Sequence, residues 1–194
     1  MKSIFHLLFM SAILGSPILA QENESKASVG IQNSAVTATE ISLETKLMKM
    51  ESLYKQGEVS YVEVLAAEAE LLQFKLASGT RNAEILKRLR EIYSAQIKLA
   101  QVSDNREAAL EFQIKLLEVS TNTDSRDGLL NCYKQLIDYR LDKYNRGAGS
   151  YIDVLQTEIS YLKATLPGQS PEQAKKIEEE IRQKQDELKQ ILTI

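Results

Sequence analysis

Apolar residues recur along most of this 194-residue chain at intervals of three and four positions, the spacing that places side chains on one face of an α-helix. Two of these stripes lead up to a glycine, Gly57 or Gly147, and both resume after a serine, Ser60 or Ser150. The first stripe contains Leu43, Leu47, Met50 and Tyr54, and then Val62, Leu65, Ala69, Leu72 and Leu76. The second contains Tyr133, Ile137, the polar Arg140 and Tyr144, and then Ile152, Leu155, Ile159, Leu162 and Leu166. The pattern predicts two units, each made of a helix, a short break and a second helix.

The two units are similar in sequence as well as in pattern. Residues 54–76 and 144–166 are identical at nine of 23 positions without a gap. An internal repeat indicates one supersecondary unit used twice. Tyr61 and Tyr151 are among the identical positions although they lie outside the apolar stripe. Their recurrence leaves two explanations open, which are common ancestry alone and a retained contact surface.

Each break has the residues of a tight turn between two helices. Gly57 and Gly147 stand where a helix is expected to end in a left-handed residue, a conformation that glycine adopts without steric cost. The serines three residues later are predicted N-caps, and Glu63 and Asp153 complete S-x-x-E and S-x-x-D capping boxes. We therefore expect two αα-hairpin tips.

The chain between the tips admits two layouts. The apolar stripe keeps its phase from each tip toward residues 101–107, which favours two legs of about 42 residues, each ~63 Å long at 1.5 Å per residue. These legs would turn near Ser103 and place both tips at the same end of the molecule. The alternative breaks the helices at 78–80 and 120–127, where the residues are poor helix formers. It gives more and shorter helices and places the tips elsewhere.

Three further segments are expected outside the duplicated region 38–166. Residues 1–20 have the basic start, short apolar run and small final residue of a secretory signal peptide, and the apolar run is too short to span a bilayer. Residues 21–37 are polar and aperiodic, which is typical of a flexible linker. Residues 167–194 contain a helix that begins with Ser170 as N-cap and Pro171 as first residue. Its apolar stripe is expected to pack on the bundle and not on a membrane surface, because residues 178–180 are all glutamates.

The composition limits the chemistry that the chain can perform. We find no segment with the period-two alternation of a strand, so the expected fold class is all-α, an elongated antiparallel coiled-coil or helical-hairpin bundle with an internal duplication. His6 is the only histidine and lies in the predicted signal peptide, and Cys132 is the only cysteine. A catalytic Ser/His/Asp or Cys/His group, a metal site and a bound cofactor are therefore not expected. The formal net charge of −3 and the predicted export also argue against a nucleic-acid partner.

The repeated phrase Y-x-x-G-x-x-S-x-x-[DE]-V-L, followed by glutamate and spaced leucines, resembles the helical hairpins of TolC-like outer-membrane efflux proteins. Chains of that family also contain the phrase twice. Their glycine turn is the periplasmic tip of a coiled-coil hairpin that meets a membrane-fusion adaptor, and the channels are trimers. TolC-like chains are more than twice as long and contribute strands to an outer-membrane barrel, for which this sequence has no alternating apolar segments. The resemblance therefore implies the periplasmic helical part alone.

Carried over residue by residue, the resemblance implies a partner-binding surface at the hairpin tips. Its members are Gly57, Ser60, Tyr61, Glu63 and Leu65 in the first tip and Gly147, Ser150, Tyr151, Asp153 and Leu155 in the second. The expected function is non-enzymatic docking of an exported, periplasmic protein to an adaptor or efflux assembly, with a trimer as the implied oligomer and no membrane span after the leader. The alternative is a periplasmic coiled-coil scaffold or holdase chaperone, and a third possibility is a truncated relic of a channel.

Overall fold

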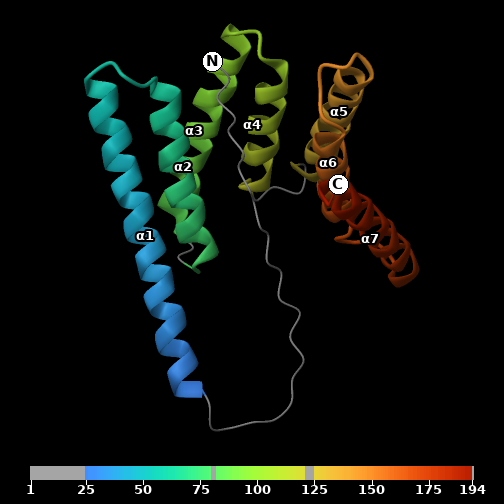
Figure 1. Ribbon diagram of the computed structural model, residues 1–194, viewed down its shortest axis with the longest axis horizontal. Helices are drawn as coiled ribbons and strands as arrows, with labels where there is room; N and C mark the ends of the chain where they lie inside the picture. The colour runs from blue at the N-terminus through green and yellow to red at the C-terminus, as the bar shows by residue number, and fades with distance from the viewer. Residues whose placement is uncertain (1–24, 80–81, 121–124, 194) are drawn as a thin grey trace. The chain divides into compact units, whose positions relative to one another are not determined.

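The computed structural model describes residues 25–79, 82–120 and 125–193, with side chains described from residue 38 onward. The predicted signal peptide, residues 1–20, lies outside the described residues. The described part contains seven helices and no strand, so the predicted all-α class is confirmed. The helices are α1 (Ser25–Lys55), α2 (Tyr61–Ala77), α3 (Ala83–Val102), α4 (Arg106–Glu118), α5 (Ser125–Asn145), α6 (Tyr151–Thr165) and α7 (Pro171–Leu192) (Figure 1).

Helix α1 begins earlier than the sequence suggested. It starts at Ser25 and so passes through most of residues 21–37, which were predicted to form a flexible linker. That segment contains no proline, and extending an existing helix gains one hydrogen bond for each residue that is fixed. A polar, aperiodic sequence can therefore continue a helix that apolar residues stabilise further along. The chain divides into one unit of residues 1–38 and a second of residues 39–194, and the description below concerns the second unit.

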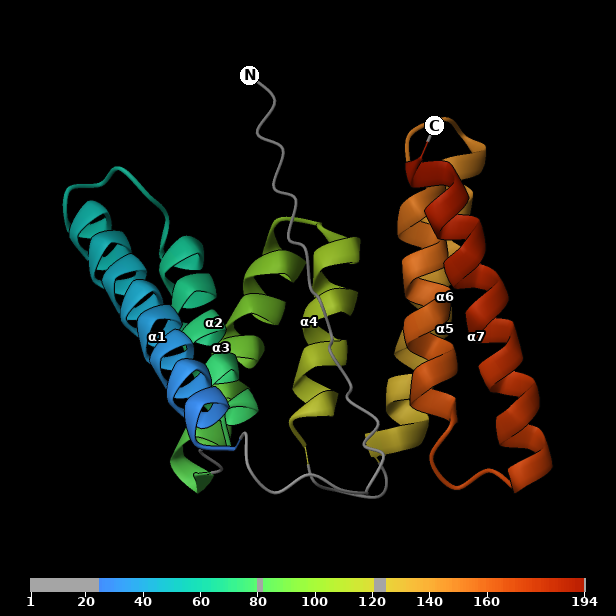
Figure 2. The same cartoon turned by 60° about the horizontal axis from the view of Figure 1, so that its bottom comes forward.

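Successive helices of this unit run antiparallel. Each helix from α2 to α6 packs closely on the next in sequence, whereas ion pairs join α1 to α2. On α1 and α2, Glu44 pairs with Lys75 and Lys46 pairs with Glu70, so one helix ascends as the other descends. The same relation joins the later helices, and Figure 2 shows the up-and-down series from a second direction. Both hairpin tips, and the turn between α3 and α4, lie at one end of the series (Figures 1 and 2). We call this end the tip end.

The two long legs predicted from the stripe are not observed. Helix α2 ends at Ala77 and α3 begins at Ala83, while α4 ends at Glu118 and α5 begins at Ser125. The breaks of the alternative layout, near 78–80 and 120–127, are therefore the correct ones, although both tips lie at the same end of the series. Gly79 adopts a φ of +90° after α2, and the side chain of Asn82 caps α3 by accepting from the Glu84 amide at 2.8 Å. The predicted turn near Ser103 is present, but it lies at the tip end, between the two tips.

The apolar core consists of three clusters that follow one another along the series. The first joins Leu65 and Ala69 of α2 to Leu89, Ile92 and Tyr93 of α3. The second joins Leu110 and Ile114 of α4 to Tyr133 and Leu136 of α5, and the third joins Ile159 and Leu162 of α6 to Ile181 of α7. Burying a leucine or isoleucine contributes about 1.5–3 kcal/mol. Phe112 of α4 also packs on the first cluster and Tyr161 of α6 on the second, so the clusters join successive helices from α2 to α7.

The last helix forms as the sequence predicted. Helix α7 begins at Pro171, and Ser170 is its N-cap, with a capping box to Gln173. Its apolar stripe packs on α6 through Ile177, Ile181 and Leu188. None of the helices in the described residues is long and apolar enough to cross a membrane.

Candidate functional site: the hairpin tips

The first tip closes α1 with two backbone hydrogen bonds. Gly57 has a φ of +75°, its amide donates to the Tyr54 carbonyl at 2.9 Å, and the Glu58 amide donates to the Leu53 carbonyl at 2.9 Å. This pair of bonds satisfies the last carbonyls of a helix that ends in a left-handed residue. A Cβ at Gly57 would meet no atom within 4 Å. The position therefore favours glycine because of its backbone conformation and not because of crowding.

The second tip has the same two bonds at the corresponding positions. Gly147 has a φ of +71°, and its amide donates to the Tyr144 carbonyl at 2.8 Å. The Ala148 amide donates to the Lys143 carbonyl at 2.9 Å. The predicted helix end at a left-handed glycine is therefore confirmed at both tips.

The two serines begin the following helices in different ways. At Ser60 the carboxylate of Glu63 accepts from the serine amide at 2.7 Å and from its hydroxyl at 2.9 Å, so the predicted capping box is present. The hydrogen bond from the Ser60 amide is the main reason why the pKa of Glu63 is lowered. At Ser150 the serine oxygen accepts from the Ile152 amide at 3.2 Å, and in the described chain Asp153 does not complete a capping box. Aspartate is one methylene shorter than the glutamate or glutamine of a capping box.

Each tip carries a pair of tyrosines that contact each other across the turn. The rings of Tyr54 and Tyr61 have centroids 5.6 Å apart and planes inclined at 45°. Those of Tyr144 and Tyr151 are 5.2 Å apart and inclined at 37°. The pairs join the last turn of one helix to the first residue of the next. The sequence contained a signal for this pairing, because a tyrosine recurs seven positions after another in both copies.

Most of the predicted tip residues are exposed, but the two leucines are not. Of the predicted residues, Tyr61 retains 47% of its surface; Tyr54 and Tyr144, which were not in the predicted surface, retain 46 and 43%. Leu65 and Leu155 are 2 and 0% exposed and belong to the core. These leucines position the start of α2 and α6 and are not part of an accessible surface, which corrects their place in the predicted surface.

The second tip is more covered than the first. The hydroxyl of Tyr151 hydrogen-bonds to the carboxylate of Glu187 on α7, which raises the pKa of the tyrosine. The C-terminal end of α7 lies beside this tip (Figure 2). Tyr151 is consequently half-buried, whereas Tyr61 is exposed.

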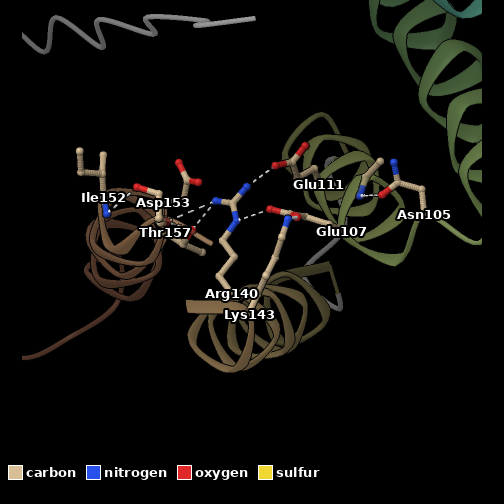
Figure 3. Close-up of polar contacts among 10 residues, drawn as sticks. Asn105, Glu107, Glu111, Arg140, Lys143, Ile152, Asp153 and Thr157 are labelled. Atoms are coloured by element: carbon tan, nitrogen blue, oxygen red, sulfur yellow. Dashed lines mark hydrogen bonds and ion pairs between the residues drawn. The ribbon is translucent and has the colours of Figure 1, made fainter. Parts of the chain in front are cut away.

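A charged cluster beside the second tip was not anticipated from the sequence. Arg140 of α5 donates from Nε to Glu107 Oε1 at 2.9 Å and from Nη1 to Thr157 Oγ1 at 2.6 Å, and it also pairs with Glu111. Lys143 Nζ lies 2.7 Å from Glu107 Oε2. Figure 3 shows the guanidinium between the carboxylates of α4 and the first turns of α6. Arg140 thereby ties three helices together just below the tip.

The electrostatics of this cluster differ between its two glutamates. Burial raises the pKa of Glu107, but hydrogen bonds from Lys143 and Arg140 outweigh it and leave the pKa below its ordinary value. Burial dominates at Glu111 and raises its pKa despite the nearby Arg140. The carboxylates and cations neutralise one another, so the cluster is suited to fixing the orientation of α5 and α6.

The described residues contain no group of three or more histidine, cysteine, aspartate or glutamate side chains placed to hold a metal ion. No protein-family model, curated protein or solved structure matches the chain. The geometry of the tips and the residues that compose them are therefore the basis for the function proposed below.

Proposed function

We propose that the protein is an exported, non-enzymatic helical protein that docks end-on to a membrane-fusion adaptor or another efflux component through its two hairpin tips. In this proposal the tips are related by internal duplication and act like the periplasmic hairpin tips of TolC-like efflux proteins. The observation that carries it is the occurrence of two tips with the same backbone bonds and the same tyrosine pair at one end of the helix series.

The chemistry of the tips supports a protein partner. A turn between helices requires a helix-ending residue and a cap, and the tips supply these with glycine and serine. It does not require half-exposed aromatic side chains, which Tyr54, Tyr61 and Tyr144 provide. Tyrosine is enriched in protein–protein interfaces because it combines a large apolar ring with a polar hydroxyl.

Photo-crosslinking in intact cells tests the docking proposal. A photoreactive amino acid at Tyr61 or at Tyr144 should yield a crosslinked adduct whose partner, identified by mass spectrometry, is an adaptor or efflux component. The matched control is the same amino acid at Lys176, an exposed residue in the first two turns of α7, and it should yield none. The N-terminal end of α7 lies away from the tip end (Figure 2). Equal crosslinking from all three positions would contradict docking through the tips.

A backbone variant tests whether the tip geometry matters. Gly57→Val combined with Gly147→Val places β-branched residues at two positive-φ positions, and should abolish the adducts at Tyr61 and Tyr144. The helical signal in far-ultraviolet circular dichroism should change little, because few residues other than those of the turns are affected. Unchanged adducts would show that the partner does not depend on the tips.

Export is tested separately by fractionation. If residues 1–20 are a signal peptide, the periplasmic fraction should contain a shortened protein whose N-terminus lies near Gln21. Recovery of the uncleaved chain from the cytosol would refute a periplasmic docking role.

A scaffold or holdase is the second candidate, and the exposed apolar residues of α1 favour it. Ile41 and Met48 are 57 and 64% exposed, and exposed apolar surface is what a holdase offers to an unfolded client. A holdase should suppress aggregation of a denatured test protein, and Met48→Lys should weaken this suppression. The Gly57→Val and Gly147→Val variant should leave it unchanged, which distinguishes the two functions.

A further inference from the structure

The first and last helices of the series differ in the character of their free faces. The exposed face of α7 is charged, and its charges form ion pairs along the helix: Glu172 with Lys176, Glu179 with Arg182 and Asp186 with Lys189. On α1, the exposed residues Ile41, Thr45, Met48 and Ser52 form a stripe without charge, at steps of four, three and four, although charged residues are exposed elsewhere on this helix: Lys46, Lys49, Glu51 and Lys55. A charged face is typical of a helix in contact with water, whereas steps of three and four with apolar members are typical of a coiled-coil seam.

The residues that flank this seam and those behind it hold α1 against α2. Glu44 lies 3.0 Å from Lys75, Glu40 lies 3.3 Å from the same ammonium, and Lys46 pairs with Glu70. These ion pairs fix the rotation of α1 about its own axis. The seam residues therefore face away from α2, and the described helices that pack closely are α2 to α7.

Each polar member of the seam already has a hydrogen-bond partner one turn away. The Thr45 hydroxyl already donates to the Ile41 carbonyl at 2.8 Å. The Ser52 oxygen accepts from Gln56 at 3.3 Å. Burying a hydroxyl that already has a partner avoids the penalty of an unsatisfied group.

Charges beside the seam favour a parallel partner with the same sequence. If Ile41 and Met48 occupy d positions of a heptad, Glu44 is at g and Lys49 is at e. In a parallel pair, a g residue of one helix lies beside the e residue five positions later in the other, and such pairs determine orientation. Glu44 binds Lys75 of its own α2 through Oε1, and its Oε2 would meet Lys49 of the other copy, whereas an antiparallel pair brings Glu44 near a glutamate. Lys49 has no ion pair or hydrogen bond within residues 38–193 as described.

We propose that α1 pairs with α1 of a second copy as a short parallel coiled coil, with Ile41 and Met48 at its centre. The seam is short, so the dimer should be weak and depend on concentration. Because α1 runs toward Gly57 in both copies, the first tips of the two copies would point the same way. This proposal does not rest on docking to an efflux component, since it concerns a different face of the molecule.

Sedimentation equilibrium of the full chain after leader removal tests the pairing. The protein should show a reversible monomer–dimer equilibrium, and Met48→Lys should shift it to monomer across the same concentrations. Val102→Lys is the matched control, because Val102 is 88% exposed but lies at the end of α3; its equilibrium should equal that of the natural chain. A monomer at every concentration, or a dimer that Met48→Lys leaves unchanged, would overturn the proposal. Binding of the monomer to lipid vesicles that Met48→Lys abolishes would assign the face to a membrane surface instead.

Disulfide trapping tests the orientation. With Cys132→Ser removing the natural thiol, Met48→Cys alone should form a disulfide-linked dimer under mild oxidation. Lys176→Cys, at an exposed position on α7, should remain monomeric. A mixture of Ile41→Cys and Met48→Cys chains that links only 41 to 48 would show an antiparallel pair and overturn the parallel one. Lys49→Glu should raise the dissociation constant several-fold at low salt and less at high salt.

Discussion

The ring of Tyr61 lies against the ring of Tyr54 across the first tip, with centroids 5.6 Å apart. Tyr151 has the same relation to Tyr144 in the second tip. The recurrence of these tyrosines therefore has a cause inside each tip, which is contact between the end of one helix and the start of the next. The first pair remains accessible to a partner despite this contact, because Tyr54 and Tyr61 are still 46 and 47% exposed. Stacking and docking are thus compatible uses of the same side chains.

The tyrosine pair should contribute measurably to stability. Tyr61→Ala and Tyr54→Ala are each expected to lower the free energy of unfolding, and the coupling between them should be about 0.5–1 kcal/mol, the lower part of the range for aromatic pairs. Urea unfolding of the two single variants, the double variant and the natural chain gives this coupling. Tyr61→Phe is the control and should retain it, because the ring contact does not need the hydroxyl. Strictly additive single effects would show that the rings do not stabilise each other.

Replacing a tip glycine with alanine should lower the stability of the protein, whereas the same substitution inside a helix should raise it. Gly57→Ala forces a side chain into a φ of +75° and should cost about 1–2 kcal/mol. Gly128 lies inside α5, where a new Cβ would make only ordinary contacts with Leu117, at 3.7 and 3.8 Å. Gly128→Ala should therefore stabilise the protein by about 0.5–1 kcal/mol. Thermal or urea unfolding of the two variants checks both signs, and a loss at Gly128 as large as that at Gly57 would contradict the explanation.

The tips could be predicted from sequence because their geometry is encoded locally. Glycine permits the left-handed helix end at residue 57 and serine caps the helix that begins at residue 61, and both effects act within a few residues. The stripe of apolar residues did not predict the helix boundary at residues 78–82. Helices on both sides of a loop face the same core, so the stripe keeps its phase whether or not the helix is continuous. Asn82, which caps α3, is a local signal for a break that the apolar stripe does not contain.

Arg140 shows why the cluster beside the second tip was missed. The residue occupies a position on the predicted apolar stripe, where it is the one polar residue before Gly147 and has no evident partner in the sequence. Its partners Glu107 and Glu111 are on α4, and they meet it only because α4 ends at Glu118 and the chain reverses before α5. A contact between helices that depends on a loop cannot be read from the pattern of either helix alone.

Arg140 should be one of the most important polar side chains for stability. Its side chain is 16% exposed and bonds to α4 and α6. Arg140→Met should destabilise the protein by about 2–3 kcal/mol, somewhat less than the loss of one partner from a fully buried pair, because Lys143 still neutralises Glu107. Methionine is the residue at the corresponding position of the first unit, Met50. Arg146→Met is the control; its pair with Asp142 is 65 and 61% exposed, so its loss should be near zero. Equal losses of stability for Arg140→Met and Arg146→Met in urea unfolding would show that Arg140 does not hold the three helices together.

The two glutamates beside Arg140 should have opposite effects on the pH dependence of stability. The pKa of Glu107 is lowered by folding, so its charged form contributes stability at neutral pH. That contribution is lost as the pH falls from the ordinary value of 4.5 through the lowered pKa. Glu107→Gln should therefore weaken the protein at pH 7, and its difference from the natural chain should shrink toward pH 3.

The pKa of Glu111 is raised by folding, so the folded state holds this proton at a pH where the unfolded chain has released it. Its contribution to stability therefore grows as the pH falls through the raised pKa and is absent at neutral pH. Glu111→Gln should cost little at pH 7 and should remove part of this gain in acid; the effect should be small because the side chain is 41% exposed. Urea unfolding of both variants between pH 7 and pH 3 separates the two signs. The same pH trend for both variants would mean that Arg140 and Lys143 do not distinguish the two carboxylates.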